Sequence, residues 1–480
     1  MSFRHVFNES FPTLFMYQNV CLISPPWINR NRSIWQNVEG KNIPFGLGYL
    51  AAVLERDSHA KVSIIDAKAE DLTVQQTVHR ISRKTPDLIG ITSCTYDYSD
   101  GIALAQILKE KVAGVPICVG GIHASVLPEY TLNHSCVDFV VRGEGECTFL
   151  ELVQGKSPQE IKGLSYKKKG EVVHNSHRRV IENLDELPRL SYHLLPMDKY
   201  YPTAGQCRRL PAVAMVASRG CPGKCIFCCS SLTGHRVRRF SPQRISDEIS
   251  FLAEEYDMKE VVFMDDTMTF PREEMVHLCN LLKQEKYDVI WDCSTRVNFV
   301  DQPLLELMKE AGCNQISFGI ESGDDAVLQS IKKGHTIDQV KKAVQLAKKA
   351  GLEVRGSFIL GFPADCEETM NRTIEISHEL KLDLASFYIA TPYPGTEMFE
   401  WAEKNDKLLT KNWSFYDQSH CIMDIPCASH QIVEKLYQKA WRSFYWRPSY
   451  LLKRFTKLRS IHDVTSALRA FKGVIAVSGQ

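Results

Sequence analysis

Three cysteines in one short loop constrain this chain more than any other feature. The stretch Cys221-Pro-Gly-Lys-Cys225-Ile-Phe-Cys228 has C-x3-C-x2-C spacing, and its proline and glycine mark a tight turn. The apolar run over residues 212–217 predicts a buried strand that leads into the loop. Three thiolates this close together can hold a metal centre. They suit a [4Fe-4S] cluster in which one iron has no protein ligand.

Two other interpretations of the loop stay open at this point. A zinc site usually takes four ligands, often as two C-x2-C pairs. Cys229 directly follows Cys228, so that ligation by both is awkward, and no second well-spaced pair lies nearby. The three residues can also be ordinary cytosolic thiols. The spacing favours the cluster over both alternatives.

Length and composition exclude several classes of protein. A chain of 480 residues predicts two domains and connecting segments. The net charge of +1 gives no reason to expect a nucleic-acid partner. Sixteen cysteines without a secretory signal favour a reducing, cytoplasmic location. No apolar run approaches about 18 residues, so no transmembrane segment is expected.

Short apolar runs alternate with helical patterns between residues 18 and 152. Strands are predicted at residues 20–24, 62–66, 88–93, 116–121 and 137–141, and helices at 44–56, 73–83 and 100–111. This alternation is typical of an α/β fold with a doubly wound parallel sheet. Ligands of such sheets bind beyond the carboxyl ends of the strands.

The loops after the third, fourth and fifth predicted strands carry small, hydroxyl and polar residues. Such residues allow a bulky ligand to approach the backbone, although turns and helix caps explain each of them singly. The candidate contacts in these loops are Ser93, Thr95, Tyr96, Gly120, Gly121, His123, Gly143 and Glu144.

The rest of the chain divides into a linker, a second domain and a tail. Residues 153–209 have weak periodicity and include a hairpin, so they are interpreted as a linker. Six strand–helix units over residues 210–400 predict an incomplete (β/α)6 barrel of the TIM type, with its active site at the carboxyl ends of the strands. The expected strands are residues 212–217, 260–264, 289–294, 315–320, 354–360 and 385–390. Residues 401–480 are expected to form a helical C-terminal region.

Polar side chains gather at the predicted carboxyl ends of these barrel strands. Carboxylates there can accept ribose hydroxyls, and a cation can pair with a ligand carboxylate, which suits a zwitterionic nucleoside. Each residue also has an ordinary structural explanation, such as a helix cap or a core ion pair. The candidates are Phe227, Asp265, Asp266, Ser294, Arg296, Glu321, Arg355, Ser357 and Leu360.

The cysteine loop, with Phe227 before its third cysteine, resembles the radical S-adenosylmethionine (SAM) superfamily. The resemblance extends over about residues 210–400. It implies that the three cysteines hold a [4Fe-4S] cluster whose open iron chelates SAM, and that reduced SAM releases a 5′-deoxyadenosyl radical. It also implies that the barrel candidates above bind SAM, with Glu321 on the ribose and Asp265 or Asp266 on the methionyl amine.

Residues 18–152 resemble the cobalamin-binding domain that precedes many radical SAM barrels. The resemblance implies that Ser93, Thr95 and the Gly120-Gly121 loop cradle the corrinoid tail. No D-x-H-x-x-G sequence is present, so the usual histidine ligand to the lower face of cobalt is missing. His123 lies in the wrong loop to replace it. Tyr96 covering this face is a hypothesis, and an unchanged cobalt spectrum after Tyr96→Ala would remove it.

The whole chain is similar to cobalamin-dependent radical SAM enzymes of the group that includes the anaerobic magnesium-protoporphyrin monomethyl ester cyclase and its methyltransferase relatives. This similarity implies methyl transfer to an unactivated carbon of a small molecule, with flavodoxin or ferredoxin as electron donor. Radical cyclisation, oxidation or rearrangement is the alternative, and a non-catalytic corrinoid-binding regulator is a minor one. The residues identify neither a substrate nor a catalytic base.

The tail combines aromatic and basic residues. Residues 433–446 predict a helix, and a basic run with Lys453, Arg454, Lys457 and Arg459 follows it. A basic amphipathic helix can lie on a membrane surface or meet a partner. A solvated helix packed on the barrel is the favoured interpretation, because apolar stripes usually face a core.

Overall fold

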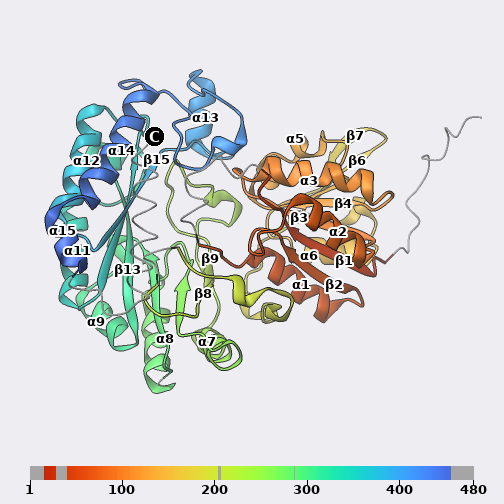
Figure 1. Cartoon of the computed structure of the whole chain (residues 1–480), viewed down its shortest axis with the longest axis horizontal. Helices are drawn as coiled ribbons and strands as arrows, with labels where there is room; N and C mark the ends of the chain where they lie inside the picture. Colours follow the sequence, from red (N-terminus) through yellow and green to blue (C-terminus); the bar gives the residue numbers. More distant parts are fainter. Residues whose placement is uncertain (1–15, 29–39, 204–206, 286, 456–480) are drawn as a thin grey trace, which may run out of the picture.

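Two parallel sheets with helices on their faces make up the protein. The computed structural model describes residues 16–28, 40–203, 207–285 and 287–455. Figure 1 shows the first sheet and its helices, coloured red to yellow, beside a barrel-like second part coloured green to blue. The expected α/β fold, a doubly wound sheet followed by a partial barrel, is confirmed.

The first sheet has the strand order β2-β1-β3-β4-β5-β6-β7, and the first five of these strands are parallel. All five strands predicted for this part form, as β1 (Asn19–Ser24), β2 (Lys61–Asp66), β3 (Leu88–Thr92), β4 (Ile117–Gly120) and β5 (Phe139–Val141). One face packs against α1 (Phe45–Asp57) and α6 (Glu146–Val153). The other packs against α2 (Val74–Lys84), α3 (Tyr98–Lys111), α4 (Ile122–Val126) and α5 (Pro128–Leu132).

A hairpin extends this sheet beyond the boundary predicted at residue 152. Strands β6 (Leu164–Lys168) and β7 (Glu171–His174) pair antiparallel, and β6 continues the sheet on β5. Sequence analysis placed this hairpin in the linker because its periodicity is weak. The hairpin belongs to the first sheet because β6 pairs with β5, and a local sequence pattern does not reveal pairing between separate segments.

The second sheet is parallel throughout, with the order β15-β14-β13-β12-β11-β8. The six strands are those predicted: β8 (Ala212–Met215), β11 (Glu260–Phe263), β12 (Ile290–Thr295), β13 (Cys313–Glu321), β14 (Glu353–Leu360) and β15 (Leu384–Ile389). Its helices are α7 (Pro242–Tyr256), α8 (Arg272–Glu285), α9 (Gln302–Glu310), α10 (Asp325–Ser330), α11 (Ile337–Lys349), α12 (Glu367–Glu379) and α13 (Glu397–Lys404). A short ribbon of β9 (Ser218–Arg219) and β10 (Arg238–Arg239) stands outside this sheet.

The concave face of the barrel is lined by small side chains. Along β13 and β14, fully buried residues alternate with half-buried ones, and the half-buried positions include Ser317, Gly319, Ser357 and Ile359. Successive side chains of a strand point to opposite faces, so these four lie on one face of the sheet. The interior of this barrel is therefore partly open, unlike the filled core of a closed barrel.

The C-terminal region covers the edge of the barrel and joins it to the first sheet. Helix α14 (His430–Tyr445) lies along β15, where the Tyr445 hydroxyl donates to the Ala385 carbonyl oxygen and accepts from the Ala385 amide. Helix α15 (Pro448–Phe455) follows, and Lys457 and Arg459 of the basic run lie outside the described residues. Trp413 and Tyr416 belong to the apolar core of the first sheet. Within the described part of the chain, no helix is long and apolar enough to cross a membrane.

A buried glutamate fixes the linker to the base of the barrel. Glu260, the first residue of β11, is fully buried, and its Oε2 accepts hydrogen bonds of 2.6 and 2.7 Å from the backbone amides of Arg208 and Arg209. Its Oε1 has no hydrogen-bond partner among the described residues. Burial raises the pKa of this carboxyl from 4.5 to about 7.

This shift predicts a pH dependence of stability. The folded state binds the Glu260 proton more tightly than the unfolded state, so the stabilisation is complete below pH 4.5 and is lost as the pH rises through about 7. Relative to Glu260→Gln, the wild type should lose about 2 kcal/mol of unfolding free energy between pH 5 and pH 8. Denaturant unfolding at both pH values measures this, with the exposed Glu254→Gln as control. An equal difference at both pH values would contradict the assignment.

Candidate active site

The cysteine loop connects the two strands of the β9–β10 ribbon, directly after β8. Gly220 starts it with a φ of 92°, and a Cβ there would lie 2.3 Å from the Arg236 carbonyl oxygen, so glycine is required. At its centre the Ile226 amide donates to the Ile331 carbonyl oxygen (3.2 Å), and the Ile226 carbonyl accepts from the Met398 amide (2.9 Å). The backbone is thus held between α10 and α13.

The three thiols lie in a positively charged setting. The hydrogen bond from Cys228 and the cations Lys333 and Arg296 together outweigh burial and lower the pKa of the Cys225 thiol to about 6. Arg296 Nη1 lies 3.6 Å from Cys225 Sγ. Cys221 Sγ lies 3.4 Å from Thr267 Oγ1 and accepts from the Gly223 amide. The thiolate is the form that ligates metal, so this setting favours ligation.

The donor set fits a polynuclear centre. Cys225 is buried, Cys221 is half-buried and Cys228 is exposed, so one side of the group is open. Among the residues that the structure describes, no three His, Cys, Asp or Glu side chains are placed to hold a single metal ion. Three thiol donors on one loop match the needs of a [4Fe-4S] cluster better than those of a tetrahedral zinc ion.

A buried ion pair follows β13. Glu321 ends this strand with the left-handed φ of 71°, at a register shift against β14. Its Oε1 accepts a 2.6 Å hydrogen bond from Lys333 Nζ, and both side chains are less than a tenth exposed. Gly319 leaves room for the pair, because a Cβ there would lie 2.7 Å from Glu321 Oε1. A non-glycine residue with positive φ that is fixed by buried contacts is typical of functional sites.

The two aspartates after β11 have different environments. Asp265 is buried and accepts hydrogen bonds from the Ala217 amide and the Ser218 hydroxyl, so its carboxylate fixes the start of the ribbon. Burial raises its pKa. Asp266 is exposed beside it. Of the two candidates for the methionyl amine, Asp266 is the one with a carboxylate left for a ligand.

The remaining barrel candidates divide between the concave face and the core. Ser294 and Ser357 are half-buried, as a ligand-facing residue should be, whereas Leu360 is fully buried in the apolar core and its neighbour Ile359 is half-buried. Arg355 lies near the start of β14, away from the carboxyl ends, and donates to Ser386 Oγ at 2.7 Å.

Two further candidates stand at the cysteine loop. Phe227 packs against Phe362 with ring centroids 5.3 Å apart, and Lys333 Nζ lies 6.0 Å from its ring centroid. Arg296 turns to the cysteine loop and to the Lys333 carbonyl oxygen, which it contacts through Nη2. The Arg296 guanidinium therefore stands beside the thiols.

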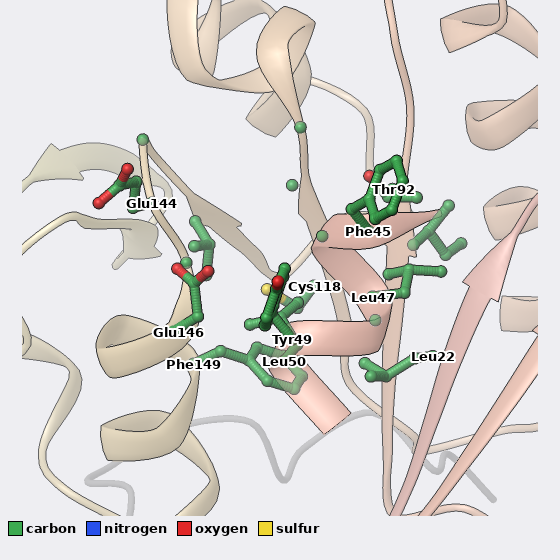
Figure 2. A pocket seen from close by; sticks show the side chains of 18 of the residues that line it. Leu22, Phe45, Leu47, Tyr49, Leu50, Thr92, Cys118, Glu144, Glu146 and Phe149 are labelled. Atoms are coloured by element: carbon green, nitrogen blue, oxygen red, sulfur yellow. The ribbon is translucent and has the colours of Figure 1, made fainter. Parts of the chain in front are cut away.

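A pocket of about 260 Å³ opens at the carboxyl ends of the first sheet (Figure 2). Its walls are mostly apolar and come from β1, α1, β3, β4 and the start of α6, including Leu22, Phe45, Leu47, Tyr49, Leu50, Cys118 and Phe149. Four predicted contacts line it, namely Gly120, Gly121, Gly143 and Glu144. Thr92, Glu146 and Arg219 line it too and were not predicted.

The pocket fits a large cofactor with polar substituents. Gly121 has a φ of 102°, and a Cβ there would lie 2.3 Å from the Ser93 carbonyl oxygen, so the backbone is open at this wall. Two buried oxygens beside it, Ser93 Oγ and Glu146 Oε2, have no hydrogen-bond partner within the described ranges. Unsatisfied buried acceptors are costly unless a ligand supplies donors. The amide groups of a corrinoid are such donors.

Four predicted cobalamin contacts, including Ser93 whose hydroxyl lies beside the pocket, are not among the residues that line it. His123 is fully buried between Tyr98 and Trp413, with ring centroids 4.0 and 4.9 Å away, and burial lowers its pKa to about 4. Helix α4 turns the ring into the core, so His123 does not line this pocket. Thr95 is buried, and Tyr96 stacks on Trp27 at 5.7 Å.

Comparison with known proteins agrees with this arrangement. Residues 32–153 match the family model described as the B12 binding domain, and residues 215–376 match that of the radical SAM superfamily. An uncharacterized methyltransferase of Pyrococcus horikoshii is 40% identical over 95% of this chain and 98% of its own length. The anaerobic magnesium-protoporphyrin IX monomethyl ester cyclase of Rubrivivax gelatinosus is 28% identical over 88% of this chain and 77% of its own.

The structure of OxsB, a cobalamin-dependent SAM radical enzyme, superposes with a TM-score of 0.72 at 16% identity, over 95% of this chain and 71% of OxsB, and so shares the fold. Fold and site thus define a radical SAM enzyme with an added B12 binding domain, a class that implies a [4Fe-4S] cluster, SAM and cobalamin as cofactors. Within that class, this chain belongs to the cobalamin-dependent radical SAM methyltransferase family.

Sequence reasoning missed Lys333, which the structure places against Glu321. Lys333→Met leaves the Glu321 carboxylate buried without its partner, so the unfolding free energy should fall by about 3–5 kcal/mol. The adjacent Lys332 pairs with Glu397 at the surface, where both side chains are more than half exposed. Lys332→Met should therefore cost at most about 1 kcal/mol. Denaturant midpoints of both variants measure this, and equal losses would contradict a buried pair.

Proposed function

We propose that this enzyme transfers a methyl group to an unactivated carbon of a small molecule, using a [4Fe-4S] cluster, SAM and cobalamin. One observation carries the proposal. The loop with the three cysteines connects the two strands of the β9–β10 ribbon. Arg219 of that ribbon lines the pocket at the carboxyl ends of the first sheet. The proposed cluster site and the proposed cobalamin site therefore lie close together. A reaction that uses both cofactors on one substrate requires this proximity.

Each site has residues suited to its cofactor. When bound, the cluster supplies the electron that releases the 5′-deoxyadenosyl radical from SAM, and cobalamin carries the methyl group. Cys221, Cys225 and Cys228 would hold the cluster, and the cations Lys333 and Arg296 favour the thiolate form of Cys225. Glu321, oriented by Lys333, would accept the ribose hydroxyls of SAM.

The remaining contacts follow from position. Asp266 would bind the methionyl amine, and the half-buried Ser294, Ser357 and Ile359 would line the space for the nucleoside. The apolar pocket with its Gly120-Gly121 wall would hold the corrinoid tail. An electron donor such as flavodoxin or ferredoxin, a cytoplasmic location and a small-molecule substrate belong to the same proposal.

A second reaction, radical cyclisation or oxidation without methyl transfer, is favoured by the similarity to the cyclase of Rubrivivax gelatinosus. Anaerobic incubation of the reconstituted enzyme with methyl-deuterated SAM and an extract of small metabolites separates the two. Methyl transfer predicts a product three mass units heavier than the one made with unlabelled SAM. A product that forms with 5′-deoxyadenosine but carries no deuterium would establish the cyclase-like reaction instead.

The cluster ligands can be tested without a substrate. Protein reconstituted under anaerobic conditions should bind about four irons and four sulfides per chain. Alanine at Cys221, Cys225 or Cys228 should remove most of both. Alanine at Cys229, whose Sγ lies 3.6 Å from the Gly395 carbonyl oxygen, should leave both unchanged and is the matched control. Full iron and sulfide in a variant without all three cysteines would refute the assignment.

A further inference from the structure

Four charged side chains join the base of the cysteine loop to the wall of the pocket. Arg219 and Arg238 are register partners in the β9–β10 ribbon, so they stand side by side where the loop begins and ends. Opposite them, Glu144 lies in the turn between β5 and α6, Glu146 is the first residue of α6, and both line the pocket (Figure 2). We call these four residues the arginine–glutamate clamp.

The clamp is connected in a chain of short contacts. Arg219 Nη2 lies 2.7 Å from Glu146 Oε1, and Arg219 Nη1 lies 3.4 Å from Glu144 Oε1. Arg238 donates to both oxygens of Glu144, at 2.7 and 3.0 Å. A guanidinium can bridge two carboxylates in this way because its donors form a planar fork. Glu144 thus ties the two arginines together.

Burial makes the clamp stiff. The exposed fractions of the side chains are 15% for Arg219, 5% for Glu146, 3% for Arg238 and 11% for Glu144. Charges this far from water are weakly screened, and removing one partner leaves another charge buried alone. Burial by itself would raise the pKa of Glu144, but the hydrogen bond from Arg238 and the charge of Arg219 lower it overall.

Neighbouring contacts fix the clamp on both sides. The Ile181 amide donates to Glu144 Oε2 at 2.8 Å, and Arg238 donates to the Ile181 carbonyl oxygen at 2.6 Å, so the linker closes over it. The Arg219 guanidinium lies 5.3 Å from the ring centroid of Tyr49, a pocket residue of α1. Gly220 then leads directly into Cys221.

We propose that the arginine–glutamate clamp is a positioning device that fixes the distance between the cluster held by the cysteine loop and the cobalamin held in the pocket. The inference rests on the proposed function, since it needs both cofactors. The physical reason is that the radical chemistry started at the cluster must end with the methyl group carried by cobalamin, so the two sites need a fixed separation. A displacement of about 1 Å can cost a hundredfold in rate. The four residues position the cofactors and do not themselves react.

The test measures the distance itself. Cobalt(II) in cobalamin and the reduced cluster are both paramagnetic, so pulsed electron paramagnetic resonance on the holoenzyme gives the distribution of their separation. Arg219→Lys and Arg238→Lys keep the charge and lose the fork. We expect the distribution to become at least twice as wide, with the same cobalamin and iron per chain as in the wild type.

Arg189→Lys is the matched control. Arg189 also pairs with a carboxylate, Glu248 at 3.2 Å, and also lies over an aromatic ring, that of Phe251 at 4.2 Å, but it joins the linker to α7. Its distribution should equal that of the wild type. Wild-type widths in both clamp variants would overturn the proposal. Loss of cobalamin in Arg219→Lys would also overturn it, because Arg219 would then bind the cofactor rather than position it.

A second measurement needs no cofactor. Amide hydrogen exchange of residues 220–237 in the purified chain should be about tenfold faster in Arg219→Lys than in Arg189→Lys, since release of the ribbon exposes the loop. Equal exchange in the two variants would contradict the proposal. Wild-type protein that binds one cofactor and never the other would instead refute the proposed function. Because the exchange measurement needs no cofactor, it tests the clamp separately from the proposed function.

Discussion

The physical constraint on which this structure depends is the burial of opposite charges around three thiols. Metal-binding thiolates are anions, and Cys225 is buried, so nearby cations must balance its charge. Lys333 and Arg296 supply that charge, and Glu321 in turn balances Lys333. Gly319 has no side chain because a Cβ would intrude on this pair. The need to balance the charge of the cysteines thereby accounts for Arg296 after β12, for Glu321 and Gly319 on β13, and for Lys333 after α10.

Most of the fold could be predicted from the sequence because its signals are local. Apolar runs of five to seven residues mark every parallel strand of both sheets. Helix starts are marked locally as well, since Thr336 forms a capping box with Gln339, and Ser241 caps α7 with Pro242 in the first turn. The β6–β7 hairpin was assigned to the linker because its place depends on pairing with β5, which is a contact at long range.

The candidate site was predictable only in part, and for the same reason. The cysteine spacing and the glycine after β4 are visible in a short window of sequence. Lys333 lies twelve residues after Glu321, and no sequence pattern predicts that the two side chains form a buried ion pair. Glu144 was expected to contact cobalamin, yet its carboxylate is occupied by Arg238 and Arg219. His123 lies in a loop expected to contact cobalamin, yet its ring packs between Tyr98 and Trp413, a contact that no short window of sequence reveals.

The division of the site also explains how related enzymes can share this fold and run different reactions. In the proposed function, the cysteines, ion pairs and pocket serve the cofactors, which carry the difficult chemistry. The concave face of the barrel is lined with Ser317, Ser357 and Ile359, which fix no particular substrate. The segment around Trp413 and Tyr416 packs on the first domain. Gln418, which follows it, accepts a hydrogen bond through its carbonyl oxygen from the amide of Ile389, the last residue of β15. The segment therefore joins the first domain to the last strand of the barrel, so this packing helps to fix how the two parts of the chain meet.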